Sequence, residues 1–363
     1  MDRFPISKLK VPLQRADLEA MLRLLRISWK LLQSPAYREM LAPELPETAL
    51  FDPGYRAVMM GYDFHLTEAG PRLIEVNTNA GGAALALRAC HGVPKLTASL
   101  ARRLVRMFQR EWRDFARDDR PLRSIVILDE KPAEQALYPE MNRYIEWFSA
   151  AGISAHIAGP EELEGGAQGL SLRGVPVDLI YNRHCDFYLE DQPLAAIRAA
   201  YLAGTVCLSP NPFVYGYLAD KRRLVLWREQ ERMAAVGLNA DEIALLQRVV
   251  PESFLLSDRD PDSVWQARKE LVLKPVDRFG GKGVLLGRSM SRKRFEQFDP
   301  QLTLVQQLVP PSQVEESDGN SFKVDIRLFA WRDRGLGVAA RLYQGQVTNL
   351  QTEGGGFAAV RLA

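Results

Sequence analysis

The stretch that decides the fold of this chain is residues 63–77, which read DFHLTEAGPRLIEVN. Two alternating runs of apolar and polar residues flank a Gly-Pro turn, and this pattern predicts a β-hairpin. Glu75 and Asn77 are two positions apart, so their side chains leave the same face of the strand. A turn centred near position 69 or 70 places Asp63 opposite one of them. Two carboxylates and an amide oxygen then converge as hard ligands suited to Mg²⁺, unless the hairpin is simply polar and exposed.

A second informative stretch is residues 271–286, which read LVLKPVDRFGGKGVLL. An apolar strand delivers Lys274, three glycines follow at 280, 281 and 283, and a second apolar strand returns. Glycines let backbone N–H groups approach a phosphate closely. The pattern lacks the Gly-Lys-Ser/Thr of a Walker A loop, so it favours a glycine-rich lid over a nucleotide. A flexible hairpin turn is the plain alternative.

The third stretch is residues 323–331, which read KVDIRLFAW. Arg327 stands in an alternating strand between apolar neighbours, where a cation either reaches solvent or faces an anion. Two further polar residues follow it, Arg341 and Asn349, the latter ahead of three glycines at 354–356.

The chain has 363 residues, which is more than one hydrophobic core normally holds, so we expect two or three subdomains. From Ser124 strands alternate with helices, which predicts a small, mostly parallel α/β domain. The strands are expected at 125–128, 153–157, 177–181 and 205–208, with helices at 134–151 and 194–203. Helical spacing is also present at 13–34 and at 95–117.

Composition excludes several function classes. The net charge of +2 is too small to favour a nucleic-acid partner. The three cysteines are an odd, widely spaced set, which favours neither a disulfide framework nor a metal site. No apolar signal core or run of about 18 apolar residues is present, so we expect a cytoplasmic protein that does not enter a membrane.

The combined motifs resemble the ATP-grasp family. The 63–77 hairpin, continuing as EVNTNAGG, resembles the metal-binding hairpin of D-alanine–D-alanine ligases and ribosomal-protein glutamate ligases. The VLKP strand with its glycine loop is similar to the triphosphate lid, and VQQLV at 305–309 is similar to the adenine hinge. ADK at 219–221 resembles the first ATP-contacting lysine. The DIR motif at 325–327, with Arg341 and Asn349, is similar to the glutamate-ligase branch.

The order of these motifs departs from that of ordinary members, in which the metal hairpin comes last. The chain therefore resembles circularly permuted ATP-grasp proteins, whose relatives include glutathionylspermidine synthase. The resemblance implies an α/β (α+β) fold in which two ATP-grasp lobes accompany a Rossmann-like pre-ATP-grasp domain. Permutation is physically inexpensive where the original termini lie close together. It requires the hairpin to share a sheet with the strand containing Asp325–Ala330.

The resemblance also implies domain boundaries. Residues 1–118 would hold N-terminal helices and the hairpin part of the ATP-grasp C-lobe, and 119–215 the pre-ATP-grasp domain. Residues 216–312 would form the N-lobe with the glycine lid, and 313–363 the rest of the C-lobe.

The activity implied is a carboxylate–amine ligase that uses ATP and Mg²⁺ and proceeds through an acyl phosphate. The metal would be held by Asp63, Glu75 and Asn77. The other residues implied are, for the nucleotide, Lys221, Lys274, Gly280, Gly281, Gly283, Gln306, Gln307 and Val309, and for catalysis Arg327, Arg341 and Asn349. A structural role is expected for His65.

One position is equivocal. Several ligase branches have an arginine two residues before the metal aspartate, where this chain has Gly61. The glutamate-ligase branch also has glycine there, so the anion-stabilising role passes to Arg327 or Arg341.

The sequence says least about the substrate-binding residues. Arg183 follows a strand of the α/β domain, at the strand end where ligands gather, and is our candidate for binding a substrate carboxylate. A buried ion pair with Asp186 is the alternative. We expect a small-molecule or peptide carboxylate and an amine as substrates, with a homodimer left open. An inactive ATP-binding scaffold and an ATP-grasp phosphotransferase are the competing functions.

Overall fold

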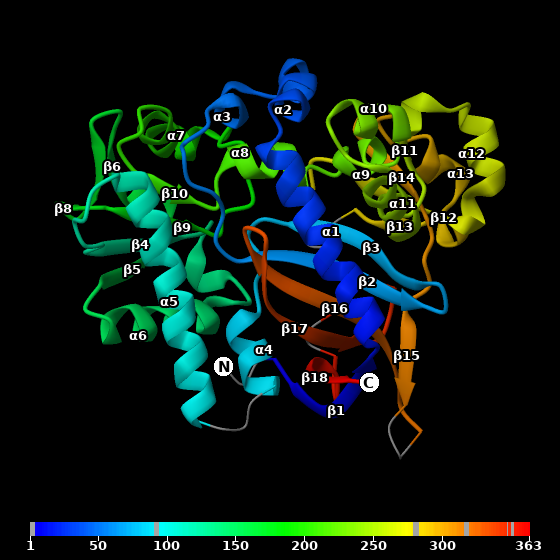
Figure 1. Cartoon of the computed structure of the whole chain (residues 1–363), viewed down its shortest axis with the longest axis horizontal. Coiled ribbons are helices and arrows are strands. Elements are labelled where there is room, and N and C mark those ends of the chain that lie inside the picture. The colour runs from blue at the N-terminus through cyan, green and yellow to red at the C-terminus, as the bar shows by residue number, and fades with distance from the viewer. Residues whose placement is uncertain (1–3, 91–93, 279–282, 316–318, 347, 350–351) are drawn as a thin grey trace.

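The computed structural model describes residues 4–90, 94–278, 283–315, 319–346, 348–349 and 352–363. Within these residues the strands form four sheets. Figure 1 shows the largest sheet at the lower centre, the α/β domain to its left and a smaller antiparallel sheet to its upper right.

The large sheet joins the two ends of the chain. Its strands run in the order β1 (Ile6–Leu13), β18 (Gly356–Leu362), β17 (Arg334–Tyr343), β16 (Ser321–Trp331), β2 (Met60–Thr67) and β3 (Gly70–Asn77), and β15 (Ser312–Glu315) pairs with β16. Strands β2 and β16 are antiparallel neighbours, with Asp63 opposite Arg327. The prediction that the hairpin shares a sheet with the strand containing Asp325–Ala330 is therefore confirmed.

The two faces of β2 differ in chemistry because its side chains alternate. Tyr62 and Phe64 are fully buried in the main core, beneath helix α1 (Arg15–Gln33), which lies across this face of the sheet (Figure 1). The Tyr62 hydroxyl is 2.8 Å from the Ser28 hydroxyl of that helix, so the buried phenol has a partner. Asp63 and His65 point to the opposite face.

The hairpin register depends on a bulge that the sequence pattern does not reveal. The two-residue turn, Glu68-Ala69, pairs Thr67 with Gly70, slightly earlier than predicted. That register alone would set Asp63 opposite Ile74 and turn Glu75 away from it. A bulge at Ile74 restores the predicted pairing of Asp63 with Glu75.

The α/β domain has the predicted parallel sheet. Its order is β10 (Cys207–Ser209), β9 (Leu179–Asn182), β4 (Ser124–Leu128) and β5 (Ser154–Ala158), and every pair is parallel. The helices are α5 (Pro94–Ala116), α6 (Tyr138–Ala150) and α7 (Ala195–Leu202). The pattern missed a small antiparallel sheet, β6 (Leu163–Gly166), β7 (Gly169–Leu172) and β8 (Val175–Pro176).

A third unit, the lid sheet, consists of β11 (Ser253–Leu255), β14 (Thr303–Gln307), β12 (Leu271–Pro275) and β13 (Leu285–Leu286). Its own core includes Phe254, Leu273, Val305 and Phe295, the last from helix α13 (Arg292–Phe295). The other helices are α2 (Pro35–Leu41), α3 (Glu47–Leu50), α4 (Ala83–Cys90), α8 (Pro212–Val214), α9 (Arg223–Leu226), α10 (Gln230–Ala235), α11 (Ala240–Val249) and α12 (Pro261–Ala267).

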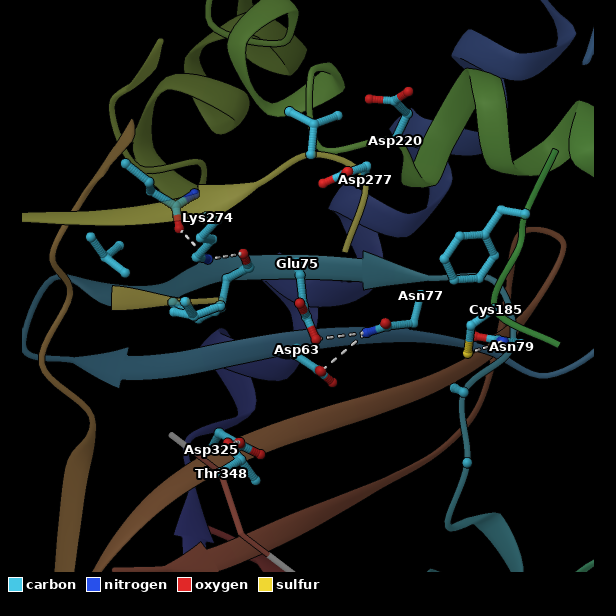
Figure 2. Close-up of a pocket in the computed structure, with 18 of the residues that line it drawn as sticks. Asp63, Glu75, Asn77, Asn79, Cys185, Asp220, Lys274, Asp277, Asp325 and Thr348 are labelled. Carbon is cyan, nitrogen blue, oxygen red and sulfur yellow. Dashed lines mark hydrogen bonds between the residues drawn. The ribbon is translucent and has the colours of Figure 1, made fainter. Parts of the chain in front are cut away.

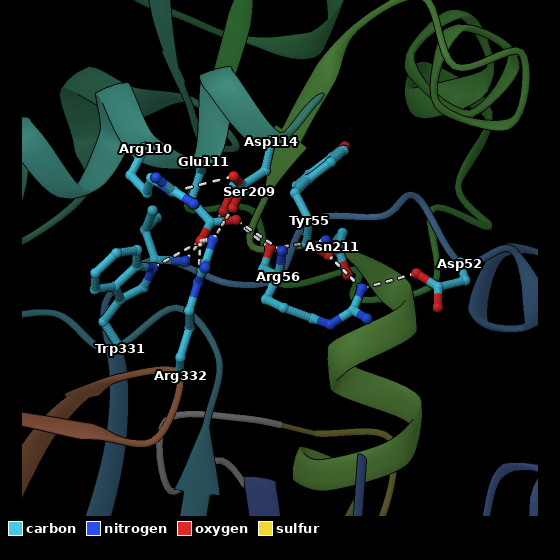
Figure 3. Close-up of polar contacts among 11 residues, drawn as sticks. Asp52, Tyr55, Arg56, Arg110, Glu111, Asp114, Ser209, Asn211, Trp331 and Arg332 are labelled. Carbon is cyan, nitrogen blue, oxygen red and sulfur yellow. Dashed lines mark hydrogen bonds and ion pairs between the residues drawn. The ribbon is translucent and has the colours of Figure 1, made fainter. Parts of the chain in front are cut away.

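The α/β domain is attached to the large sheet through a buried carboxylate on α5 (Figure 3). Glu111 has no exposed surface, and its Oε1 accepts hydrogen bonds from Trp331 Nε1 at 2.7 Å and Arg332 Nη2 at 2.9 Å. Its Oε2 accepts the backbone N–H of Arg56 at 2.7 Å. Because all these partners lie outside the α/β sheet, Glu111 fixes how that domain meets β16 and the segment before β2.

None of the helices in the described part of the chain combines the length and apolarity that crossing a membrane requires.

Candidate functional site

A cavity of about 1650 Å³ lies where the three units meet. Its walls include Asp63 and Arg327 from the large sheet, Lys274 from the lid sheet, and Asp129 and Arg183 from the α/β domain. The fold therefore gathers charged side chains from both ends and the middle of the sequence around one space.

Asp63 is the centre of an ion-pair network in this cavity. It is buried, and it binds Arg327 through two contacts of 2.6 Å, to Nε and Nη2, and Arg341 Nη2 at 2.9 Å. Burial alone would raise the pKa of Asp63, but the two guanidinium groups outweigh burial and hold it well below its usual range. Arg341 also donates through Nε to Asp325 at 2.5 Å. Both predicted arginines thus lie beside the predicted metal aspartate.

The structure explains the glycine two residues before Asp63. A Cβ added to Gly61 would lie 2.7 Å from Ala80 Cβ and 3.2 Å from Arg327 Nε. The Arg327 side chain therefore fills the space that a larger residue at position 61 would take. The cation reaches the aspartate from the neighbouring strand instead of from β2 itself.

Glu75 and Asn77 lie next to Asp63, as Figure 2 shows. Asn77 Nδ2 is 3.2 Å from Asp63 Oδ2 and 3.1 Å from Glu75 Oε1. No group of three His, Cys, Asp or Glu residues with metal-binding geometry occurs among the described residues, so the predicted Mg²⁺ site depends on Asn77. The donor types fit the metal, since rotating the amide presents its oxygen beside two carboxylates. Asp63 can take part only by exchanging some of its contacts with Arg327 and Arg341.

Lys274 reaches the cavity from the lid sheet. It is buried, and its Nζ donates to Gln306 Oε1 at 2.7 Å and to the Ile74 carbonyl at 3.0 Å. The bulge leaves that carbonyl outside the strand ladder, so the lysine uses the atom that the bulge frees. Burial lowers the pKa of Lys274 to about 8, although Glu75 opposes the shift. Lys274 is therefore a cation that burial makes easier to neutralise.

The other described residues predicted to contact phosphate are not among those that line the cavity. Lys221 follows a π-helical turn, Tyr215–Ala219, and its Nζ donates to the carbonyls of Val276 and Arg278. Its neighbours Asp220 and Arg222 line the cavity. Gly280 and Gly281 lie outside the described residues. Gly283 has a φ of +77°, which favours glycine, but it does not line the cavity. The phosphate-binding roles of these residues stay predictions.

The predicted adenine hinge lines the cavity at Gln306, Gln307 and Val309. The side chain of Gln306 is committed to Lys274, and Gln307 Oε1 accepts from Arg72 at 3.3 Å. The nucleotide-binding role of these residues stays a prediction.

His65 Nδ1 is 2.7 Å from the Val309 carbonyl. Burial lowers the pKa of His65, so the ring is neutral at pH 7 and Nδ1 carries the proton that it donates to the carbonyl. His65 thereby ties the hinge to β2, which agrees with the structural role expected for it.

Arg183 lines the cavity at its α/β-domain side and is 8% exposed. Its Nη1 donates to Tyr181 Oη at 3.2 Å and to the Ala80 carbonyl at 3.3 Å. The alternative ion pair with Asp186 is not formed, because Asp186 accepts the backbone N–H groups of Tyr188 and Asp191. Arg183 Nε is buried and has no hydrogen-bond partner.

Two solved structures share the fold of this chain. A glutathione synthetase-like effector from Globodera pallida, in its apo form, matches with a TM-score of 0.64 at 12% identity, over 99% of this chain and 90% of that chain. A putative γ-glutamylcysteine synthetase from Methylobacillus flagellatus KT matches with a TM-score of 0.53 at 10% identity, over 95% of this chain and 87% of that chain. The chain therefore shares the fold of these two proteins. A scan of family models and a search of curated proteins by sequence found no match.

The cavity wall also contains acidic residues to which the sequence analysis assigned no role. Asp325 is buried in the cavity wall and accepts Thr348 Oγ1 at 2.6 Å in addition to Arg341. Asn349, the next residue, lines the cavity as well. The alternating 323–331 pattern could have identified Asp325, since it shares a face with Arg327. Asp129 follows a buried strand end, which is the signal by which it could have been found.

Proposed function

We propose that this chain is an ATP-dependent ligase that joins a carboxylate to an amine through an acyl phosphate. The observation that carries the proposal is the meeting of Lys274 with Asp63, Arg327 and Arg341 in one cavity, from two different sheets. A carboxylate that approaches a triphosphate is repelled by like charge, so a ligase needs several cations at that point.

Each cation has a proposed task. Lys274, with one N–H left after its two hydrogen bonds, binds a phosphate oxygen from the lid side. Lys221 joins it by exchanging its carbonyl contacts. Arg327 and Arg341 stabilise the transferring phosphoryl group and the oxyanion that forms when the amine attacks.

The acidic and amide side chains would hold Mg²⁺. Glu75 and Asn77 provide oxygen ligands, and Asp63 adds another when it releases an arginine. When bound, Mg²⁺ neutralises charge on the β- and γ-phosphates. The release would also free Arg327 or Arg341 for the phosphoryl group.

The chain order is part of the same proposal. We infer a circular permutation, with residues 1–118 and 313–363 sharing the C-lobe, 119–215 as the pre-ATP-grasp domain and 216–312 as the N-lobe. The pairing of β2 with β16 supports it, because a hairpin from the first part of the chain completes a sheet made by the last part.

The test is ADP release by the purified protein with MgATP against pools of amino acids, small peptides and amines. We expect ADP release that requires both a carboxylate and an amine. Lys274→Ala should lose ATP affinity at least tenfold in isothermal titration, whereas the exposed control Lys269→Ala should not. ATP binding without turnover on any pool would favour a scaffold, and a stable phosphorylated product would favour a phosphotransferase.

A further inference from the structure

Helix α5 carries a row of arginines on its solvent face. Five lie on the helix and the sixth directly follows it, and together they form the arginine row: Arg102, Arg103, Arg106, Arg110, Arg113 and Arg117. All six are exposed, and Figure 1 shows α5 on the near side of the α/β domain. At about 100° per residue, the five helical members fall within an arc of about 100°. The row therefore forms one positive strip, about 22 Å long at a rise of about 1.5 Å per residue.

The acidic residues of α5 do not neutralise this strip. Glu111 is turned to the buried side of the helix, where it binds Trp331 and Arg332. Asp114 pairs with Arg110 at 3.1 Å, but it also pairs with Arg332. Within the part of the chain that the structure describes, the other five arginines of the row have no acidic partner. The positive face is thus left largely uncompensated.

The spacing within the row is unfavourable for a helix on its own. Arg102 and Arg106 are four positions apart, as are Arg106 and Arg110, and like charges at that spacing repel one another. Solvent-exposed helices that are stabilised by their charges place opposite signs at these positions instead. An anionic partner would turn the repulsion into attraction, because each arginine would gain a counterion.

The rest of the chain does not share this charge. Residues 94–123 contain nine basic and four acidic residues, a net charge of +5, whereas the whole chain has +2. The remaining residues therefore carry a net charge of −3. The whole-chain value, which argued against a nucleic-acid partner, averages over this separation. A basic strip confined to one face is the electrostatic footprint of a polyanion site.

The surroundings of the row favour one kind of polyanion. None of the large apolar side chains that are exposed in the described chain lies on α5; they are Leu50, Val175, Leu302 and Leu362. A helix that lies on a membrane buries Trp, Phe or Leu side chains in it, and single-stranded nucleic acids stack on exposed aromatic residues. A duplex needs neither, since its phosphates supply essentially all of non-specific binding.

We propose that the arginine row binds the phosphate backbone of a nucleic-acid duplex without reading its bases. Each strand of a duplex has one phosphate per about 3.4 Å of axis, so a row of about 22 Å faces about six of them. A guanidinium group can donate two parallel hydrogen bonds to one phosphate. None of the six arginines lines the large cavity, so this site is separate from the proposed ligase site.

The experiment is fluorescence anisotropy of the full chain with labelled duplexes of about 24 base pairs, two of unrelated DNA sequence and one of RNA, between about 50 and about 200 mM salt. We expect the three dissociation constants to agree within about fivefold, because all three duplexes present phosphates in the same way. The logarithm of the association constant should fall against the logarithm of the salt concentration with a slope of about −4 to −5, which five phosphate contacts predict. Saturating MgATP should not displace the duplexes.

Two triple variants make the comparison specific. Replacing Arg102, Arg106 and Arg113 together by glutamine should weaken binding at least about thirtyfold at the lowest salt and make the slope shallower by about 3, because three phosphate contacts are lost. Glutamine has nearly the helix propensity of arginine, so this variant should melt close to the unaltered protein. The control variant removes the same charge from exposed arginines of other elements and should weaken binding less than about threefold; it carries Arg143→Gln, Arg173→Gln and Arg334→Gln.

Equal losses in the two triple variants would overturn the proposal, since binding would then follow net charge and not the row. Displacement by MgATP would also overturn it, because the duplex would occupy the large cavity. Binding to phosphatidylserine vesicles, lost in the row variant and unaccompanied by duplex binding, would assign the row to a membrane surface instead. A slope shallower than about −1 would mean that the row does not act as a unit.

Discussion

Asp63 and Glu111 are both buried carboxylates that bind arginine side chains. Asp63 binds Arg327 of β16, and Glu111 binds Arg332, which directly follows that strand. The two carboxylates differ in what surrounds them. Glu111 has no exposed surface and is enclosed by Trp331, Arg332 and the backbone of Arg56. Asp63 is also buried by its neighbours, but it stands in the wall of the large cavity. The Glu111 carboxylate is sealed from solvent, although the side chain of its partner Arg332 is 22% exposed, whereas Asp63 opens onto a space that a ligand can enter.

The comparison shows that a buried ion pair does not identify a functional site. Both clusters satisfy the same electrostatic requirement, since an unpaired buried charge is costly. What separates them is whether the partners can be exchanged. Water and ligands can replace the arginines on Asp63, whereas nothing can reach Glu111 without separating α5 from the large sheet.

The largest expected effect is on stability at the closed cluster. Glu111→Ala leaves the Trp331 N–H and the Arg56 N–H without their acceptor and leaves Arg332 paired with Asp114 alone, and we expect a loss of about 3–5 kcal/mol in the free energy of unfolding. Denaturant unfolding measures it, with the exposed Glu146→Ala as the control. A loss below about 1 kcal/mol would mean that the cluster is not closed.

The next effect is on turnover at the open cluster. If Arg327 stabilises the phosphoryl group as proposed, Arg327→Ala should lower ADP release by about 10²–10³-fold, because that cation is lost. Its melting temperature should fall less than that of Glu111→Ala, since water can solvate Asp63 through the cavity. Arg334→Ala, on an exposed arginine of β17, should change neither quantity. Equal loss of stability in the Arg327 and Glu111 variants would remove the distinction between the clusters.

A smaller effect is expected from Gly61→Ala. The added Cβ would lie 2.7 Å from Ala80 Cβ and close to Arg327 Nε, so it should displace the arginine and cost about 1–3 kcal/mol. We expect the rate of ADP release to fall about tenfold. The affinity for ATP should fall by a smaller factor. Activity equal to that of the unaltered chain would show that Arg327 need not occupy this space.

The smallest effect is a response to pH. The pKa of Lys274 is about 8, below the usual range, so the free site loses this charge as the pH rises from 7 to 9. ATP affinity should therefore fall about tenfold over that range, measured by titration at constant Mg²⁺. Lys274→Arg keeps its charge, and its affinity should be nearly constant. A parallel fall in both proteins would assign the pH response to another group.

The sequence predicted the parts of the site that periodicity determines. The face shared by Glu75 and Asn77, and the parallel sheet of the α/β domain, follow from patterns within a few residues. The pairing of β2 with β16 followed from the order of the motifs. These predictions succeeded because each depends on local alternation or on a known set of motifs.

Contacts between distant segments could not be derived in this way. The bulge at Ile74, the orientation of Gln306 toward Lys274 and the partners of Glu111 depend on packing between residues far apart in the sequence. Nothing local marks Glu111 in its helix as different from other acidic residues. The small sheet β6–β8 was missed because its strands are short and rich in glycine.

The contact between Lys274 and the Ile74 carbonyl has a consequence for how the protein tolerates mutation. The acceptor is a main-chain atom, so any residue that keeps the bulge at position 74 preserves the contact. The donor, by contrast, must have the reach and the positive charge of lysine. The two halves of this junction should therefore differ sharply in a saturation library, with wide tolerance at position 74 and almost none at position 274.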